Sequence, residues 1–469
     1  MALDSASTAR PEPASWLVVG GGVMGLKVAE ELLAKGQRVT IAEAAPDFGG
    51  LTGAWELGGV TWDRFYHVTL LSDSVLREQL RRLDLEQEIE WVETKTGFFA
   101  GGKLYSMSNT MEFLRFPPLG LFERLRLGGT IFLASKIRDF RAMEKQSVER
   151  WLRRWSGKGA FEKVWLPLLK AKLGEAYQQT SAAFIWAHTQ RMYKARRSGA
   201  KKEMFGYVPG GYARILDVWL DSLRARGVTL LPGHPVQEVR HEDGVGLHVN
   251  FGDGREAVYE NVVSTIASPL IAKQCKQLKS EEKSKLEAIR YLGVVCASML
   301  LKKPISPYYV TNITDTWVPL TGIIEMSTIV DSESQLGGNH LVYLPKYMID
   351  DHEDLNESDE DYRERCLATL EKMYDHFRRE DVLDFKVARA KYVAALSTVD
   401  YSTRLPPVVT SVPGFYALNS AHILEGNLNV NETLQLGETK FGEEVWPDFR
   451  SRQASDQTPL SSNEPVLSA

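Results

Sequence analysis

Short apolar and amphipathic runs follow one another in a regular order near the start of the chain. Residues 16–19 (WLVV) form an apolar run that predicts a strand, and glycines follow it directly. Over residues 23–35 the period changes to that of a helix, with leucine and alanine on one face and lysine and glutamate on the other. Gly36 would end this helix, and residues 38–43 (RVTIAE) predict a second strand. Strand, glycine turn, helix and strand in this order predict the βαβ unit of a doubly wound α/β fold.

The remainder of the chain divides by its pattern into three kinds of segment. Residues 72–204 are interpreted as mainly helical, with basic and aromatic faces. Residues 227–269 alternate apolar and polar positions between glycine-containing turns, which predicts strands and hairpins. A mixed segment with strands follows at about 291–350, and residues 414–438 predict a strand, a loop and the start of a helix.

Three of the early glycines have the spacing of a dinucleotide-binding turn. Gly20 permits a tight turn, Gly22 lets a pyrophosphate approach the main chain, and Gly25 allows close packing of helix on strand. The helix that follows offers unpaired N–H groups and a partial positive charge to the phosphates. Glu43 closes the second strand, where an acidic side chain meets the ribose hydroxyls of the adenosine. The pattern predicts a dinucleotide site, and the acid at position 43 disfavours the 2′-phosphate of NADP.

A second glycine pair, Gly49-Gly50, stands just beyond the second strand and favours FAD over NAD, because it lets another loop approach the cofactor. The stretch VVGGGVMGLKVAEELLAKGQRVTIAEAAPDFGGLTG resembles the N-terminal motif of the FAD-dependent amine oxidase, protoporphyrinogen oxidase and phytoene desaturase superfamily. The residue after the pair is often Arg in that superfamily and is Leu51 here. The resemblance implies an FAD site formed by residues in and beside the two glycine loops: Gly20, Gly22, Val23, Met24, Gly25, Glu43, Ala44, Gly49, Gly50, Leu51 and Thr52.

The resemblance covers roughly residues 15–445 and implies further site residues. WDRFYHV is similar to the superfamily segment that passes near the flavin, which makes His67 a candidate flavin-contacting and catalytic residue. The alternative is a structural histidine beside a cofactor loop. MFGYVPGGYARILDVWLDSLRARGVTLLPGHPVQEV resembles the return into the cofactor domain, and it implies that the backbone of Val236 contacts the adenine.

The C-terminal stretch PGFYALNSAHILEGNLNVNETLQLGE resembles the last FAD motif of the superfamily. In that motif the N-terminus of a helix, here at Asn429 and Val430, caps the pyrophosphate. Asn419-Ser420 replaces the Gly-Asp or Gly-Glu that is usual after the strand. An amide at Asn419 can still hydrogen-bond a ribityl hydroxyl or phosphate, but it contributes no charge.

The resemblance implies a two-domain α/β flavoprotein, with a Rossmann-like FAD-binding domain and an α+β substrate domain, and with the flavin at the interface of the two. The predicted boundaries are residues 15–70, 205–290 and 400–446 for the FAD-binding domain, 71–204 and 291–399 for the substrate domain, and 1–14 and 447–469 for disordered tails.

Composition limits the alternatives. A net charge of −5 over 469 residues gives no indication of nucleic-acid binding. The histidines and three dispersed cysteines show no metal-ligand spacing, so no metal site is predicted. Sparse cysteines and a polar N-terminus without an apolar core region favour a cytoplasmic protein. GFFAGGKL (97–104) fits GxxxxGK only formally, and it predicts a hairpin turn at Gly101-Gly102. The sequence carries no signal for an oligomeric state.

Two segments outside the cofactor motifs leave alternatives open. RMYKARRSGAKK (191–202) is either a solvated helix end or, through Arg196 and Arg197, a clamp for an anionic substrate. Residues 113–137 are apolar with interspersed arginines, and they form either a core helix pair or a peripheral membrane contact.

The resemblance implies an FAD-dependent oxidoreductase that takes a hydride from a small-molecule substrate onto flavin N5. The protein would position and shield the flavin. Two alternatives remain: a non-redox flavoenzyme resembling UDP-galactopyranose mutase, which would act on a nucleotide sugar, and a flavin-stabilised binding protein without turnover.

Overall fold

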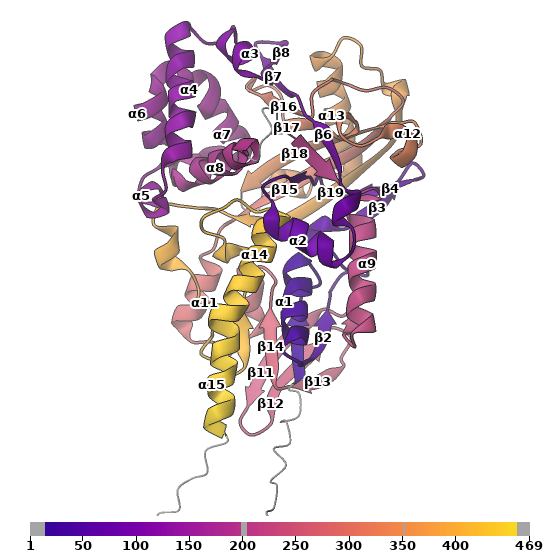
Figure 1. The fold of residues 1–469 in the computed structure, drawn as a ribbon, viewed down its shortest axis with the longest axis vertical. Helices are drawn as coiled ribbons and strands as arrows, with labels where there is room; N and C mark the ends of the chain where they lie inside the picture. Colours follow the sequence, from indigo (N-terminus) through magenta and orange to yellow (C-terminus); the bar gives the residue numbers. More distant parts are fainter. Residues whose placement is uncertain (1–14, 198–203, 350–351, 457–469) are drawn as a thin grey trace, which may run out of the picture.

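The structure, a computed structural model, describes residues 15–197, 204–349 and 352–456. A parallel sheet with the helices α1, α14 and α15 forms one end of the molecule, and a large mixed sheet with the helices α3 to α8 forms the other (Figure 1). Among the described residues, no helix is both long and apolar enough to cross a membrane.

The first sheet is the predicted doubly wound core. Its strand order is β10-β2-β1-β14-β20 and all its pairs are parallel. The strands are β1 (Ser15–Val19), β2 (Arg38–Ala42), β10 (Thr229–Leu231), β14 (Asn261–Ser264) and β20 (Phe415–Ala417). Helix α1 (Val23–Ala34) connects β1 to β2, and the predicted βαβ unit is confirmed to within one residue at each end.

Two further groups of elements cover this sheet. Helix α14 (Val430–Lys440) lies against α1 at Gly437, where an added Cβ would stand 3.2 Å from Met24 and Lys27. A three-stranded antiparallel sheet covers other strands of the parallel sheet, and helices α9, α10 and α11 complete this end of the molecule. The elements are β11 (Val236–Glu242), β12 (Gly246–Phe251), β13 (Glu256–Tyr259), α9 (Gly211–Ala225), α10 (Ser268–Gln274) and α11 (Ser280–Glu287).

The C-terminal prediction needs a correction. Residues 447–469 were expected to be a disordered tail, but α15 (Trp446–Asp456) continues as a helix. Phe449 packs edge-on against Trp16 of β1, with 5.0 Å between ring centroids, and Phe449 is buried. This aromatic contact anchors a helix whose sequence after 450 is otherwise polar. The tail predictions at 1–14 and 457–469 lie outside the described residues.

The second sheet has seven strands in the order β19-β15-β18-β17-β16-β7-β8. All 11 residues of β15 are buried, because helices and other strands cover both of its faces. Its strands are β7 (Thr96–Ala100), β8 (Lys103–Ser106), β15 (Tyr291–Leu301), β16 (Val310–Ile313), β17 (Gly322–Glu325), β18 (His340–Ile349) and β19 (Val382–Ala395). The β7–β8 hairpin confirms the turn predicted at Gly101-Gly102. Helix α13 (Asp359–Met373) packs on this sheet through Tyr362, Leu367 and Leu370.

Residues 72–204 are mainly helical as predicted, except that strands β6 to β8 occupy much of 90–106. The helices are α2 (Ser74–Arg82), α3 (Thr110–Leu114), α4 (Leu121–Lys136), α5 (Phe140–Glu144), α6 (Val148–Ala160), α7 (Leu166–Leu173) and α8 (Ala183–Arg197). Helices α5 to α8 share an apolar core around Trp151 and Phe161.

Short strands join the two ends of the molecule. The hairpin of β3 (Ala54–Leu57) and β4 (Val60–Asp63) follows the second glycine loop, and its backbone bonds to β19 through Asp384 and Lys386. A small sheet of β5 (Thr69–Leu70), β9 (Met204–Tyr207) and β6 (Glu90–Glu93) lies next in the chain. The segment 54–70 therefore runs from the glycine loops to the large sheet.

Candidate functional site

Two glycine loops meet at the carboxyl end of β1. Gly22 pairs with Gly49 in a parallel bridge, and the Gly49 N–H donates to the Gly21 carbonyl at 2.8 Å. Gly20 and Gly49 have φ angles of 105° and 117°, which other residues rarely adopt. A Cβ on Gly25 would stand 1.9 Å from the Gly20 carbonyl oxygen, so the helix can approach the strand only with glycine there. The loops thus have the geometry that the spacing predicted.

Gly22 differs from the other glycines of this turn. An added Cβ there would meet nothing closer than 4.0 Å, so the side-chain direction opens into free space. Gly22 is also the N-cap of α1 and has no side-chain cap, so the first N–H groups of the helix need another partner. The side chains of Val23 and Met24 are buried in the core, so only the backbone N–H groups of these two residues are available to a ligand. Unpaired N–H groups beside open space make this turn a candidate site for an anion such as a pyrophosphate.

The Glu43 carboxylate organises the turn. Oε2 accepts a hydrogen bond from the Gly21 N–H at 2.7 Å, and Oε1 accepts one from the Ala45 N–H at 2.8 Å. Each oxygen keeps a lone pair that a ribose hydroxyl could use. Ala44 is exposed beside it.

The adenine-side prediction at Val236 has a specific setting in the structure. The His234 N–H donates to the Glu43 carbonyl at 2.7 Å, which places the chain before β11 beside the end of β2. The Val236 carbonyl accepts from the Gln274 side chain at 3.0 Å. The contact of Val236 with an adenine therefore stays a prediction.

Arg64 is a candidate that sequence reasoning missed. Its Nη2 donates to the Gly50 carbonyl at 3.2 Å, and its Nε is buried without a hydrogen-bond partner among the described residues. A Cβ on Gly53 would collide with Nη2 at 2.0 Å, so Gly53 leaves room for the guanidinium. A guanidinium thus lies on the second glycine loop, where Leu51 itself supplies no charge and Thr52 is buried, its hydroxyl bonded to the Gly49 carbonyl at 2.8 Å. The available signal was an arginine in the quoted WDRFYHV stretch.

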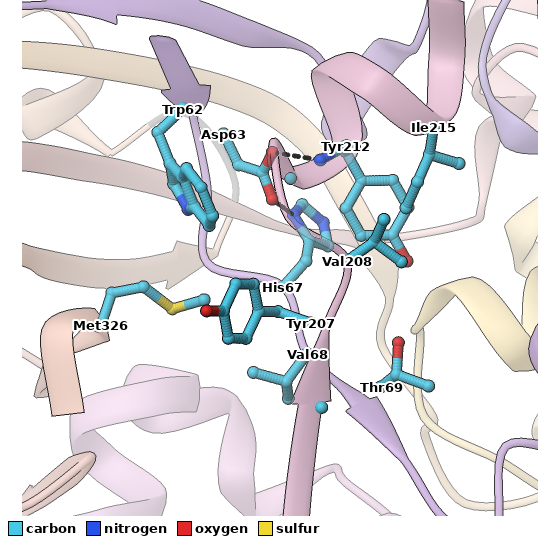
Figure 2. Close-up of a pocket in the computed structure, with 12 residues that line it drawn as sticks. Trp62, Asp63, His67, Val68, Thr69, Tyr207, Val208, Tyr212, Ile215 and Met326 are labelled. Atoms are coloured by element: carbon cyan, nitrogen blue, oxygen red, sulfur yellow. Dashed lines mark hydrogen bonds and ion pairs between the residues drawn. The ribbon is translucent and has the colours of Figure 1, made fainter. Parts of the chain in front are cut away.

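His67 lines a small cavity with Asp63 and Tyr212 (Figure 2). Its Nδ1 is 3.7 Å from Asp63 Oδ2, while Asp63 Oδ1 accepts from the Tyr212 N–H at 2.8 Å. Burial raises the pKa of the Asp63 carboxyl, and the hydrogen bond and charge of His67 act in the opposite direction. The cavity is about 10 Å³, which is room for one water molecule and far too small for a flavin ring. His67 is thus a candidate to hold a water or a proton next to a cofactor.

Unpaired polar atoms gather in the segment around His67. Buried atoms without a hydrogen-bond partner among the described residues include four in or against this segment: Trp62 Nε1, Arg64 Nε, Ser72 Oγ and Arg191 Nε. Buried polar groups in folded proteins are almost always hydrogen-bonded, so a group of exceptions is a candidate place for a ligand or ordered water to bind. The residues present therefore fit a polar cofactor that runs from the glycine loops along the segment 62–72.

The C-terminal candidates divide into two cases. Asn419 is buried, and its amide donates to Ile266 and Ser268 and accepts from the Ala421 N–H, so its polar groups already have protein partners. Asn429 caps α14 by accepting from the Glu432 N–H at 3.0 Å, and Val430 begins the helix. The half-buried N-terminus of α14 remains a candidate to face a phosphate.

A group of cations and phenols lies on the side of the site nearer the large sheet. Lys172 of α7 places Nζ 4.5 Å from the centre of the Tyr347 ring, and the Tyr347 hydroxyl is 3.0 Å from that of Tyr66. Burial lowers the pKa of the Lys172 amine. Burial, together with the charges of Lys172 and Arg191, lowers the pKa of His188 on α8 to about 4.

The same group of side chains extends to His67. Arg191 Nη2 donates to Asp73 Oδ2 at 3.0 Å, and both charges act on the Tyr212 hydroxyl. The Tyr212 ring is 5.0 Å from that of His67, which adjoins Tyr66 in the chain. Sequence reasoning missed this ring of contacts, since it joins five separate segments. Arg196 and Arg197 end α8, but their side chains lie outside the described part of the structure, and their role stays a prediction.

The parallel sheet and the paired glycine loops form a Rossmann-like core beside a second, mixed sheet. The family model described as flavin containing amine oxidoreductase matches residues 25–423, and the chain belongs to this family. It is a flavoprotein oxidoreductase with the amine oxidase-like α/β fold that the sequence predicted.

Individual relatives are distant. A protein of Synechococcus elongatus assigned as a zeta-carotene desaturase is 24% identical over 274 residues, which are 52% of this chain and 56% of that protein. The match thus spans little more than half the length of this relative. A crystal structure assigned as a protoporphyrinogen oxidase from Exiguobacterium has a TM-score of 0.73 at 16% identity, covering 93% of this chain and 99% of that one. A putrescine oxidase variant reaches 0.67 at 14% identity, covering 93% and 99%. A reduced UDP-galactopyranose mutase reaches 0.68 at 14%, covering 92% and 96%. At these identities the structures share the fold alone.

Proposed function

We propose that the protein is an FAD-dependent oxidoreductase that oxidises a small-molecule substrate by hydride removal. Bound FAD would supply the flavin N5 that accepts the hydride, and an external acceptor would restore the oxidised cofactor. The observation that carries the proposal is the pair of bridged glycine loops with the uncapped N-terminus of α1 beside open space at Gly22, together with the unpaired buried polar atoms of the segment 62–72. An NAD site would require the first glycine loop alone.

The residues have separate tasks in this proposal. The N-terminus of α1 and the backbone of Gly22 bind the pyrophosphate, and Glu43 accepts from the ribose hydroxyls. Arg64 contributes a positive charge at the second loop. His67 and the buried Asp63 hold a water or a proton at the small cavity. The hydride step itself requires no proton transfer to or from these two residues.

The charges beside the site favour an acidic substrate. Lys172 and His188 have no carboxylate partner among the described side chains, while neighbouring Arg191 is paired with Asp73. Desolvation and the positive charges of Lys172 and Arg191 lower the pKa of His188 to about 4. An acidic group on the substrate would supply the negative charge that Lys172 lacks.

The protein would act in the cytoplasm on a small molecule. The three cysteines are buried free thiols, which supports a reducing compartment and hence the cytoplasm. The partner of the site is a small molecule and not nucleic acid, in line with the net negative charge.

Purified protein mixed anaerobically with candidate substrates tests the proposed function. Loss of the oxidised flavin band with an acidic substrate, and its return on admission of oxygen or another acceptor, is the expected result. Protein that carries FAD and is reduced by a chemical reductant, but by none of the candidate substrates, would contradict the proposed activity and favour a binding protein.

A further inference from the structure

Exposed apolar side chains concentrate on one part of the surface. Of the 12 large hydrophobic residues exposed in the described structure, seven lie between residues 111 and 155. Scattered exposed apolar residues are normal, but a concentrated group indicates an interaction surface. The seven are Met111 of α3, Leu121, Phe122, Leu125, Ile131 and Phe132 of α4, and Trp155 of α6.

Helix α4 presents most of them along one stripe. Leu121, Phe122, Leu125 and Phe132 expose 62%, 71%, 57% and 56% of their surface. Leu125 lies four residues after Leu121, Phe132 lies seven after Leu125, and Phe122 adjoins Leu121, so the four share one helical face. The opposite face buries Leu127, Thr130 and Ala134 against the helical core. Helix α4 is therefore a packed element whose outer face is left uncovered, at the outer edge of the helical end in Figure 1.

The surroundings of the stripe are strongly basic. Residues 110–170 contain 13 Lys and Arg but only six Asp and Glu, in a chain whose net charge is −5. Three exposed rings each have a cation beside them: Arg126 at Phe122 (5.9 Å), Lys136 at Phe132 (5.1 Å) and Arg154 at Trp155 (5.6 Å).

The one acidic residue of α4 is already paired with a lysine, so it does not offset the positive charge around the stripe. Glu123 bonds to Lys163 Nζ at 2.9 Å and to the Gly120 N–H at 2.8 Å, and these bonds lower the pKa of its carboxyl. A surface with aromatic and aliphatic side chains along its centre and cations at its border matches an anionic lipid interface, with apolar groups in the acyl boundary and cations at the headgroups.

We propose that the outer face of α4, with Trp155 of α6, docks the protein on an anionic phospholipid surface. The basic border argues for lipid over a second copy of this chain, because two copies would bring like charges together. Docking is peripheral, through side chains that enter the interface. The proposal is independent of the flavin and of the proposed function.

Vesicle sedimentation of the full chain tests the proposal. We expect binding to phosphatidylcholine vesicles that contain phosphatidylserine, weak binding to phosphatidylcholine alone, and release by high salt. The double substitution Phe122→Ser with Leu125→Ser should weaken binding at least about tenfold. Neutralising Lys136→Gln with Arg154→Gln should weaken binding to the anionic vesicles specifically, by about tenfold.

Matched control substitutions fall on exposed apolar residues elsewhere. Val258→Ser with Leu383→Ser, exposed at 47% and 44%, should leave vesicle binding unchanged. Equal loss in these controls, or no binding to anionic vesicles by the wild type, would overturn the proposal. A concentration-dependent dimer that Phe122→Ser with Leu125→Ser dissolves, without vesicle binding, would show instead that a second copy covers the face.

Discussion

Gly22 and Gly49 form a parallel bridge that joins the phosphate-binding turn to the loop after the second strand. Neither position can carry a side chain without consequence, but the reasons differ. At Gly49 a Cβ would collide with Leu216 at 2.5 Å, whereas at Gly22 it would enter open space. The first requirement is structural, and the second leaves space for a ligand to approach the backbone.

Gly22→Val should therefore separate folding from cofactor binding. The folded protein accommodates the side chain, so its melting temperature without cofactor should change little. Its affinity for FAD should fall by at least about tenfold, equivalent to ~1.4 kcal/mol, because the valine occupies the pyrophosphate side of the loop. FAD content after purification and titration with added FAD measure the effect. Gly442→Val, at an exposed glycine with open space around it, is the control. Equal FAD affinity in both variants would remove the phosphate role from Gly22.

The first glycine loop was predictable because its signal is local. A strand of four apolar residues, a fixed glycine spacing and one amphipathic helix lie within about 25 residues, and each follows from short-range physics. Strand β15 was harder, because all of its residues are buried and no alternation distinguishes its faces. The sequence of α15 predicts a tail because the residues after 450 are polar, and nothing local shows that Phe449 packs on Trp16.

The substrate side of the site could not be predicted for a different reason. Lys172, His188 and Tyr347 come from α7, α8 and β18, and nothing in their local sequence connects them. Arg64 lay inside a quoted motif, but its unpaired Nε and the space that Gly53 leaves are properties of the folded chain.

Arg64→Met should weaken FAD binding while the β3–β4 hairpin stays intact. The substitution removes the Nη2 donor to the Gly50 carbonyl and the unpaired Nε. The expected cost in the free energy of FAD binding is about 1–3 kcal/mol, which is a roughly fivefold to more than hundredfold loss of affinity. Arg64→Lys should recover part of the affinity. Equilibrium titration monitored by flavin fluorescence measures both. Unchanged affinity in Arg64→Met would mean that the guanidinium serves only the loop.

Lys172→Met should reduce the binding of acidic ligands to the flavin-loaded protein. Small carboxylates such as benzoate provide the probe, through their perturbation of the visible flavin spectrum. Wild-type affinity should rise as the pH falls, because burial lowers the pKa of both Lys172 and His188 and a bound anion favours their protonated forms. We expect a loss of about tenfold in Lys172→Met.

Lys170→Met is the matched control for that experiment, since Lys170 lies on the same helix but pairs with Glu175 at the surface. Equal loss in both variants, or equal binding of neutral amides, would contradict an anion-selective site. FAD content, measured in parallel, distinguishes this outcome from failure of the cofactor assignment.

Glu325 should make stability fall as the pH rises. Burial raises the pKa of this carboxyl from 4.5 to about 7, against hydrogen bonds from Ser327, Ile305 and Ser306. Between these values the unfolded state loses the proton that the folded state retains, so stability is full below about pH 4.5 and declines up to about pH 7. Glu325→Gln should remove the decline and stabilise the protein by about 1–3 kcal/mol at neutral pH and above, relative to wild type. Urea unfolding at a series of pH values provides the measurement, and parallel curves for the two proteins would contradict the assignment.

The central claim, that the two glycine loops and the unpaired segment hold FAD, is tested most directly by the visible spectrum of the purified protein and the identity of the cofactor released on denaturation. The account predicts yellow protein that releases FAD in about one equivalent per chain. Colourless protein that fails to take up added FAD, yet binds NAD, would contradict it.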